Sequence, residues 1–234
     1  MTEPDGPGFA ITPGVLSAAE VDLLCGHLSG SKIRRTRGGA RNLLAEPAAS
    51  AVAHDPRLLA LASRALGAQA FPFKATLFDK SLRANWLVAW HQDTVLPIKA
   101  RREVAGWGPW SLKAGVLYAK APAQALSLVV ALRLHLDDSS SANGPLRVLP
   151  GTHRLGVLPP GRIQELSSTI RSVECLVARG GIITMWPLLL HASSRASGSA
   201  PRRVLHVEYA ASTDLGNTLE LDVAEQRDEA DEAR

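Results

Sequence analysis

The chain has 234 residues, of which 46% are hydrophobic and 21% charged, and this balance excludes a disordered or fibrous chain. No apolar run is long enough to cross a membrane, and the acidic N-terminal residues do not predict a secretory signal. The chain contains only two cysteines, which favours a reducing, cytoplasmic location over a disulfide scaffold. The formal net charge is +4, but the basic residues are scattered, so a nucleic-acid partner is not expected.

Two helices are predicted near the N-terminus. Ser17 and Glu20 have the spacing of a capping box, in which each side chain binds a backbone amide of the other, so a helix should begin after Ser17. A second helix should begin at Asp55-Pro56, because Asp is a good N-cap and Pro fits the first helical position. Gly67 is the expected C-terminal stop of this second helix.

From residue 71 the pattern changes to short apolar or alternating runs separated by turn residues. Seven strands are predicted, at residues 71–78, 85–92, 127–136, 145–150, 172–178, 181–186 and 202–210. Many short strands with regular turns are typical of an antiparallel sandwich or barrel. The fold class is therefore mainly β with flanking α, a jelly roll with the N-terminal helices packed on one face.

The predicted domain organisation is a single unit with loose ends. Residues 14–213 should form the jelly-roll domain, after a flexible arm over residues 1–13 that is rich in Gly and Pro. Residues 94–125 fit neither a helical nor a strand period and are expected to be a long connection or lid. Residues 214–234 are predicted to be an acidic, disordered tail, since the last thirteen of them carry six acidic residues and two arginines.

The sequence Trp90-His91-Gln92-Asp93 carries the first sign of chemistry. If the strand that contains His91 continues through Asp93, both side chains point to the same face. His191 follows a later predicted strand, and two histidines with one carboxylate form the facial triad of non-haem Fe(II) oxygenases. The tripeptide alone is weak evidence, because a histidine that simply hydrogen-bonds a neighbouring aspartate has the same spacing.

A basic strand follows His191. A strand that begins at Arg202 would carry four alternate side chains on one face: Arg202, Val204, His206 and Glu208. An arginine fork that faces the metal would bind a carboxylate through two hydrogen bonds, and Ser193 could add a hydroxyl. The alternative is that Arg202 and Arg203 are surface charges beside a turn.

Four segments resemble a known family: residues 39–44, 77–93, 132–156 and 186–210. They are similar to the phytanoyl-CoA dioxygenase-like (PhyH) family of Fe(II)/2-oxoglutarate-dependent oxygenases, specifically its compact bacterial members. The resemblance covers residues 14–213 and implies a double-stranded β-helix, the cupin-like form of the jelly roll. It implies that the iron ligands are His91, Asp93 and His191. It also implies that the residues around 2-oxoglutarate are Arg202, Ser193 and Lys80.

The expected activity is that of an Fe(II)/2-oxoglutarate-dependent dioxygenase with O₂ as the oxidant. We expect it to hydroxylate an unactivated carbon of a small metabolite, an amino acid or a natural-product intermediate, with desaturation or cyclisation as alternatives. An anionic substrate is expected because basic residues lie in the predicted lid, at Lys99, Arg101 and Arg102. Two other functions stay open, a nucleic-acid dealkylase of the same superfamily and a non-catalytic metal-binding jelly-roll module. The sequence gives no indication of oligomeric state.

Overall fold

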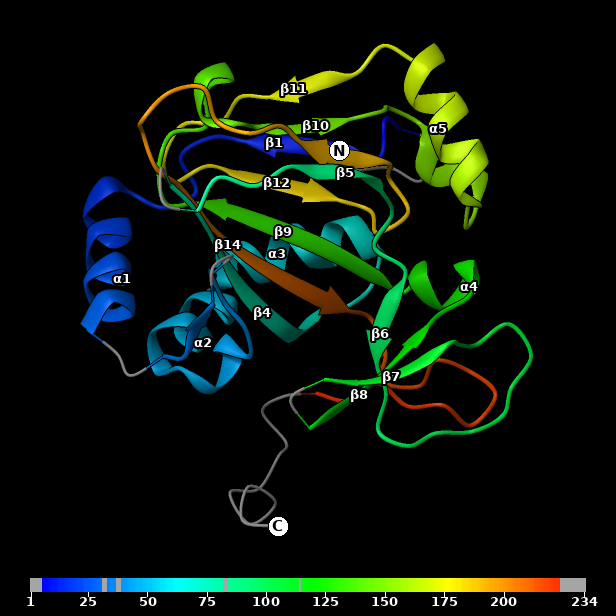
Figure 1. Cartoon of the computed structure of the whole chain (residues 1–234). Helices are drawn as coiled ribbons and strands as arrows, with labels where there is room; N and C mark the ends of the chain where they lie inside the picture. The colour runs from blue at the N-terminus through cyan, green and yellow to red at the C-terminus, as the bar shows by residue number, and fades with distance from the viewer. Residues whose placement is uncertain (1–5, 31–32, 37–38, 82–83, 114, 224–234) are drawn as a thin grey trace.

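The computed structural model of the chain describes residues 6–30, 33–36, 39–81, 84–113 and 115–223. Within them, two antiparallel sheets form a jelly roll (Figure 1). The larger sheet runs β1-β12-β9-β14-β4-β3-β2, with bounds Phe9–Thr12, Ile182–Met185, Val129–His135, Arg202–Ala210, Phe71–Lys80, Gly39–Ala40 and Arg35–Thr36. The smaller sheet runs β11-β10-β13-β5, with bounds Val173–Cys175, Leu146–Val148, His191–Ser193 and Val88–His91.

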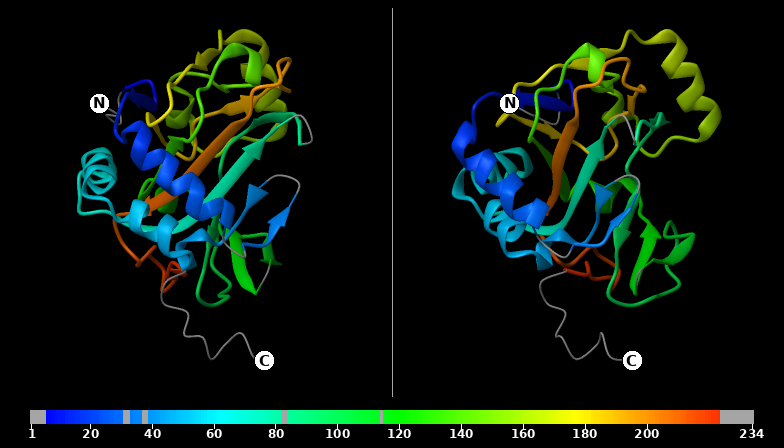
Figure 2. Two further views of the ribbon diagram at one scale, coloured as in Figure 1. Left: turned by 90° about the vertical axis from the view of Figure 1, so that its left-hand side faces the viewer. Right: turned by 60° about the vertical axis from the view of Figure 1, so that its left-hand side comes forward.

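Three N-terminal helices, α1 (Ala18–Gly30), α2 (Pro47–Ala53) and α3 (Pro56–Leu66), cover one face of the larger sheet (Figure 2). The capping box of α1 is confirmed, since the Ser17 amide donates to Glu20 Oε2 at 2.7 Å. The start of α3 is confirmed as well, because the Asp55 side chain accepts from a backbone amide of the first turn. The sequence did not predict α2.

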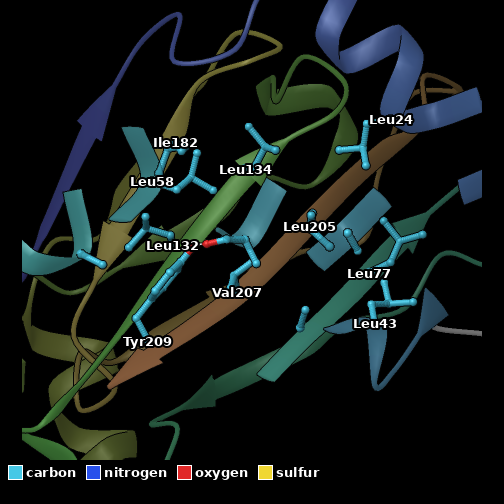
Figure 3. Close-up of a cluster of buried hydrophobic side chains, with 14 of the residues drawn as sticks. Leu24, Leu43, Leu58, Leu77, Leu132, Leu134, Ile182, Leu205, Val207 and Tyr209 are labelled. Carbon is cyan, nitrogen blue, oxygen red and sulfur yellow. Dashed lines mark hydrogen bonds between the residues drawn. The ribbon is translucent and has the colours of Figure 1, made fainter. Parts of the chain in front are cut away.

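Strand β14 shows why this face of the sheet is apolar. Its alternate residues Leu205, Val207 and Tyr209 are fully buried against the helices (Figure 3), as period-two alternation requires. The Tyr209 hydroxyl donates to the Ala53 carbonyl at 2.8 Å, which ties β14 to α2. Arg202, His206 and Glu208, which the sequence predicts on the other face of the strand, line one cavity with residues of the smaller sheet.

Residues 94–125 are not the irregular connection that the sequence predicts. They contain a third sheet, β6-β8-β7 (Val95–Pro97, Val116–Lys120 and Trp110–Lys113), followed by the short helix α4 (Ala123–Leu126). The sheet forms because its apolar side chains share a core cluster with residues near the C-terminus. Members of that cluster include Leu96, Trp107, Ala119, Leu219 and Leu221.

Both ends of the domain are more ordered than predicted. Residues 9–12, expected to be a flexible arm, form β1 and pair with β12. Residues 214–223, expected to be the beginning of a disordered tail, place Leu215, Leu219 and Leu221 in the core. The prediction was wrong there because it extended the acidic composition of the last thirteen residues to the leucine-containing segment before them. The other parts of the two predictions, at residues 1–5 and 224–234, lie outside the described residues.

All seven predicted strands are present; β14 has the predicted bounds, and the other six differ at one or both ends. The remaining elements are α5 (Pro160–Thr169) and short 3₁₀ turns at Leu43–Ala45, Ser141–Asn143 and Thr152–Leu155. Among the described residues, no helix combines the length and the apolar character needed to span a membrane.

Candidate metal centre and anion site

A cavity of about 400 Å³ opens between the two sheets. Its lining residues come from β4, β9 and β14 of the larger sheet, from β5, β10 and β13 of the smaller one, and from β6 and the neighbouring loops. The polar or charged residues that line it are Arg41, Lys74, Thr76, Lys80, His91, Gln92, Asp93, Thr94, Arg133, His191, Ser193, Arg202, His206 and Glu208. The six residues that the sequence predicts for the site are therefore in one cavity.

His91, Asp93 and His191 converge at the edge of the smaller sheet. One potential ligand atom from each lies within 4.8 Å of the other two. His91 Nε2 is 3.7 Å from Asp93 Oδ1, and His191 Nε2 is 3.5 Å from Asp93 Oδ2. This arrangement of two imidazoles and one carboxylate on one side of a point fits the donor set of a facial Fe(II) site.

The local geometry differs from the sequence interpretation in two ways. Strand β5 ends at His91, so Asp93 lies beyond it and its amide donates to the Pro187 carbonyl at 2.9 Å. His191 begins β13 instead of ending the preceding strand. The residues still meet, because β13 pairs with β5 and places His191 opposite His91.

The backbone fixes the orientation of both imidazoles. His91 Nδ1 lies 2.8 Å from the Ala89 carbonyl, and His191 Nδ1 lies 2.9 Å from the Leu189 carbonyl. A carbonyl oxygen can only accept, so each Nδ1 carries a hydrogen, and in the neutral imidazole the lone pair is then on Nε2. Both free lone pairs belong to the atoms that face Asp93, as metal binding requires.

Gln92 holds the segment between the two ligands in place. Its side-chain amide donates to the carbonyls of Gly156 and Leu188 at 2.9 and 2.8 Å, and its oxygen accepts from the Leu158 amide at 2.8 Å. The side chain is buried, so three satisfied hydrogen bonds fix its position. The positions of His91 and Asp93 on either side are fixed with it.

The protonation states suit a metal site. Burial raises the pKa of Asp93, but the imidazoles of His191, His206 and His91 outweigh that effect and lower the pKa to about 2. Burial lowers the pKa of His191 to about 4. At neutral pH the site therefore offers an ionised carboxylate and a neutral His191, the forms that bind metal ions.

A second cluster of cavity residues surrounds the Ser193 hydroxyl. Lys80 Nζ donates to Ser193 Oγ at 2.8 Å and to the Ser194 carbonyl at 2.6 Å. Arg202 Nη2 donates to the same Oγ at 3.2 Å, and Ser193 donates onward to the Gly144 carbonyl at 2.9 Å. Lys80 and Arg202 meet because they are register partners on β4 and β14.

This cluster has the character of an anion site. Lys80 is 1% exposed and Arg202 is 4% exposed, and no carboxylate of the described residues forms an ion pair with either. Burial and the neighbouring Arg202 lower the pKa of Lys80 to about 8, and burial with the charge of Arg133 lowers the pKa of Arg202 to about 10. Arg202 Nη1 is buried without a hydrogen-bond partner. A bound carboxylate, such as the distal group of 2-oxoglutarate, would satisfy that atom and balance the charge.

Eight of the polar lining residues were not among the predicted site residues: Arg41, Lys74, Thr76, Gln92, Thr94, Arg133, His206 and Glu208. Lys74 Nζ and Glu208 Oε2 form an ion pair of 2.6 Å. Arg133 could have been noticed in the sequence, because it interrupts the apolar run from Leu128 to Leu136. An arginine in such a run needs a polar environment inside the fold.

The basic residues of the predicted lid do not line the cavity. Lys99 is paired with Glu220 at 2.9 Å, and Arg101 is paired with Glu103 at 2.8 Å. Arg102 is exposed. The structure therefore does not support the use of these three residues as evidence for an anionic substrate.

Comparison with known proteins agrees with the geometry of the site. A family model described as phytanoyl-CoA dioxygenase (PhyH) matches residues 5–204. The search of curated protein sequences gave no match.

Several solved structures share the fold. AviO1 from Streptomyces viridochromogenes Tue57 is 21% identical, with a TM-score of 0.63, and the match covers 88% of this chain and 90% of that one. SnoN, a non-haem α-ketoglutarate-dependent epimerase from nogalamycin biosynthesis, is 19% identical with a TM-score of 0.63, and the match covers 91% and 83%. EctD from S. alaskensis, solved with 2-oxoglutarate and 5-hydroxyectoine, is 19% identical with a TM-score of 0.66, and the match covers 88% and 72%.

The family match covers most of the chain, and the cavity contains donor sets suited to iron and to 2-oxoglutarate. The chain belongs to the phytanoyl-CoA dioxygenase (PhyH) family and is a non-haem iron, 2-oxoglutarate-dependent oxygenase.

Proposed function

We propose that this enzyme oxidises an unactivated C–H bond of a small organic molecule, with hydroxylation as its main reaction. The observation that carries the proposal is the presence of two donor sets in one cavity of about 400 Å³. The first is the triad of His91, Asp93 and His191. The second is the pair of buried cations, Lys80 and Arg202, that meet at Ser193.

Each set has a distinct task. His91 Nε2, His191 Nε2 and a carboxylate oxygen of Asp93 would hold Fe(II) on one side and leave its other positions free. Lys80, Arg202 and Ser193 would bind the distal carboxylate of 2-oxoglutarate. Binding at two separated points fixes the orientation of the cosubstrate, and orientation is a main contribution of a protein to such a reaction.

Iron and 2-oxoglutarate supply the oxidation itself, in which R–H, O₂ and 2-oxoglutarate become R–OH, succinate and CO₂. The protein contributes geometry. Phe78, Val88 and Leu146 also line the cavity, and their apolar side chains are suited to contact the carbon skeleton of a bound substrate.

The cavity volume favours a small substrate. About 400 Å³ lies at the lower end of the range for small-molecule sites, and part of it is needed for 2-oxoglutarate. We therefore propose a metabolite, an amino acid or a natural-product intermediate. Two of the similar structures fit these chemical classes, since one is an epimerase from nogalamycin biosynthesis and another contains 5-hydroxyectoine.

An anaerobic titration tests the proposal. Fe(II) and 2-oxoglutarate are added to the purified protein, and the weak visible absorption of the iron–cosubstrate complex is recorded. We expect a saturable band that requires both components and is lost in His191→Ala. Substrates are then sought by their effect on the band and on succinate release. Absence of the band in the folded wild-type protein would contradict the proposed function.

A further inference from the structure

Arg133 occupies an unusual place for a cation. It lies in the middle of β9, an interior strand of the larger sheet, and it faces the cavity. Only 7% of the residue is exposed. The neighbouring residues along β9, Leu132 and Leu134, point the other way into the apolar core. Arg133 is therefore held inside the fold by the strand that carries it.

Arg133 forms no ion pair with a carboxylate of the described residues, although Asp93 and Glu208 are near enough for their charges to favour the protonated guanidinium. Its Nη1 lies 3.2 Å from His206 Nδ1, and its Nε is buried without a hydrogen-bond partner. Asp93 and Glu208 line the same cavity, but neither forms an ion pair with Arg133, and Glu208 is already paired with Lys74.

His206 orients the guanidinium without neutralising it. Burial and the charge of Arg133 hold the pKa of His206 well below its ordinary value, so its Nδ1 can accept the hydrogen bond from Arg133. The guanidinium also lies over the ring of Phe78, with its central carbon 5.2 Å from the ring centroid. These contacts fix one orientation and leave the positive charge available.

A buried, unpaired charge is costly, and the cost is removed when an anion binds beside it. The distal carboxylate of 2-oxoglutarate already has its own receptor, formed by Lys80, Arg202 and Ser193. Arg133 pairs in register with His206, four residues along β14 from Arg202, which is about 13 Å at the rise of a β-strand. The cluster of Lys80, Arg202 and Ser193 and the guanidinium of Arg133 are therefore separate sites on the larger sheet.

We propose that Arg133, oriented by His206, binds a carboxylate of the organic substrate. This inference rests on the proposed function and narrows its substrate to a carboxylic acid. Several apolar residues line the same cavity: Phe78, Trp86, Val88, Val95 and Leu146. The substrate then combines one acid group, held by the Arg133 fork, with an apolar body that contacts these side chains.

The test compares acids with their uncharged counterparts. Butyrate, hexanoate and benzoate, each with its primary amide, are titrated by ligand-observed NMR into protein loaded with Ni(II) and 2-oxoglutarate, and into the metal-free protein. We expect the acids to bind wild type about tenfold more tightly than the amides, as a charge-assisted pair allows. Arg133→Gln should remove the preference, and Arg133→Lys should restore part of it.

Arg101→Gln is the matched control, because it removes one positive charge from an exposed, ion-paired arginine outside the cavity. It should keep the full preference for acids. Thermal unfolding and circular dichroism confirm that each variant is folded, and the comparison of acid with amide on wild type needs no variant.

Three results would overturn the proposal. The first is equal binding of acids and amides, or no binding of either, by wild type. The second is a preference that survives Arg133→Gln. The third is weaker 2-oxoglutarate binding in Arg133→Gln with the acid preference unchanged, which would assign Arg133 to the cosubstrate. Failure of wild type to bind Ni(II) and 2-oxoglutarate would contradict the proposed function instead. The titration of the metal-free protein tests the Arg133 proposal without a bound metal, so the two proposals can fail separately.

Discussion

His91 and His191 lie opposite each other on neighbouring antiparallel strands, with ring centroids 4.1 Å apart and ring planes at 52°. The pairing of β5 with β13 brings together two side chains from distant parts of the chain. Because backbone carbonyls hold both Nδ1 atoms, the two Nε2 atoms are directed to the same point beside Asp93. The metal site is thus a consequence of sheet register.

Replacement of a triad residue should abolish iron binding. His191→Ala removes a ligand atom, and Asp93→Asn removes the only carboxylate of the triad. We expect the apparent affinity for Fe(II) to fall by more than about 100-fold, since even residues behind the ligands contribute 10–100-fold. Metal content after dialysis and succinate release measure the effect. Ser17→Ala, at the remote start of α1, is the control and should retain full metal content.

Replacement of the buried cations should weaken the binding of 2-oxoglutarate and leave the binding of Fe(II) unchanged. Each of Lys80→Met and Arg202→Met removes a charged donor. We expect the Kd for 2-oxoglutarate to rise about 10–100-fold, the equivalent of about 1.5–3 kcal/mol for a charged hydrogen bond. Calorimetric titration measures it, and Fe(II) content should stay at the wild-type level. An unchanged Kd in both variants would show that the carboxylate binds elsewhere.

Gly144 lies beside the cluster of Lys80, Arg202 and Ser193, and its backbone accepts a hydrogen bond from Ser193. It has φ +68°, and a Cβ atom there would lie 2.4 Å from the Ser194 carbonyl oxygen and 3.1 Å from Lys80 Nζ. Gly144→Ala should therefore displace Lys80 and raise the Kd for 2-oxoglutarate about tenfold, with metal binding intact. Gly67→Ala is the control, because Gly67 has φ +67° but open space around it. Equal effects of the two variants on the Kd would contradict the explanation.

His135 should make the apo protein less stable in mild acid. It is fully buried on β9, and burial with the charge of Arg133 lowers its pKa from 6.5 to about 3. Between these values the unfolded chain binds a proton that the folded protein does not, so the free energy of unfolding decreases as the pH falls from 6.5 towards 3.

The expected contribution of His135 is about 1.4 kcal/mol per pH unit, or about 2 kcal/mol between about pH 7 and pH 5. His135→Asn keeps a donor for the Arg133 carbonyl and should show a shallower decrease in urea unfolding over this interval. His27→Gln, at an exposed position of α1, should leave the slope unchanged. The same decrease in the free energy of unfolding with pH in wild type and in His135→Asn would show that His135 is not its source.

The segment at residues 214–223 should contribute to stability as core structure. Leu221 is fully buried, so Leu221→Ala should lower the free energy of unfolding by about 2–5 kcal/mol. Leu112, which is 71% exposed on β7, is the matched control, and its replacement by Ala should change the stability by less than about 0.5 kcal/mol. Chemical denaturation of both variants gives the comparison.

Local patterns predicted much of this structure because they act between near neighbours. The Ser17–Glu20 capping box, the Asp55 N-cap and the alternation along β14 each depend on residues a few positions apart. Predictions failed where the structure depends on contacts between segments that are far apart in the sequence. Trp107 and Leu221 pack in the same core cluster, and neither segment shows this partner in its own composition.

The sequence by itself determined the mainly β fold and the donor types of the metal site, and through its family resemblance it predicted the candidate residues for 2-oxoglutarate. Only the tertiary structure decided that β5 ends before Asp93 and that Arg133 faces His206 without a carboxylate partner. The physical reason is that residue type and spacing act along the chain, whereas register between strands and the balance of buried charge depend on segments that meet only in the folded protein.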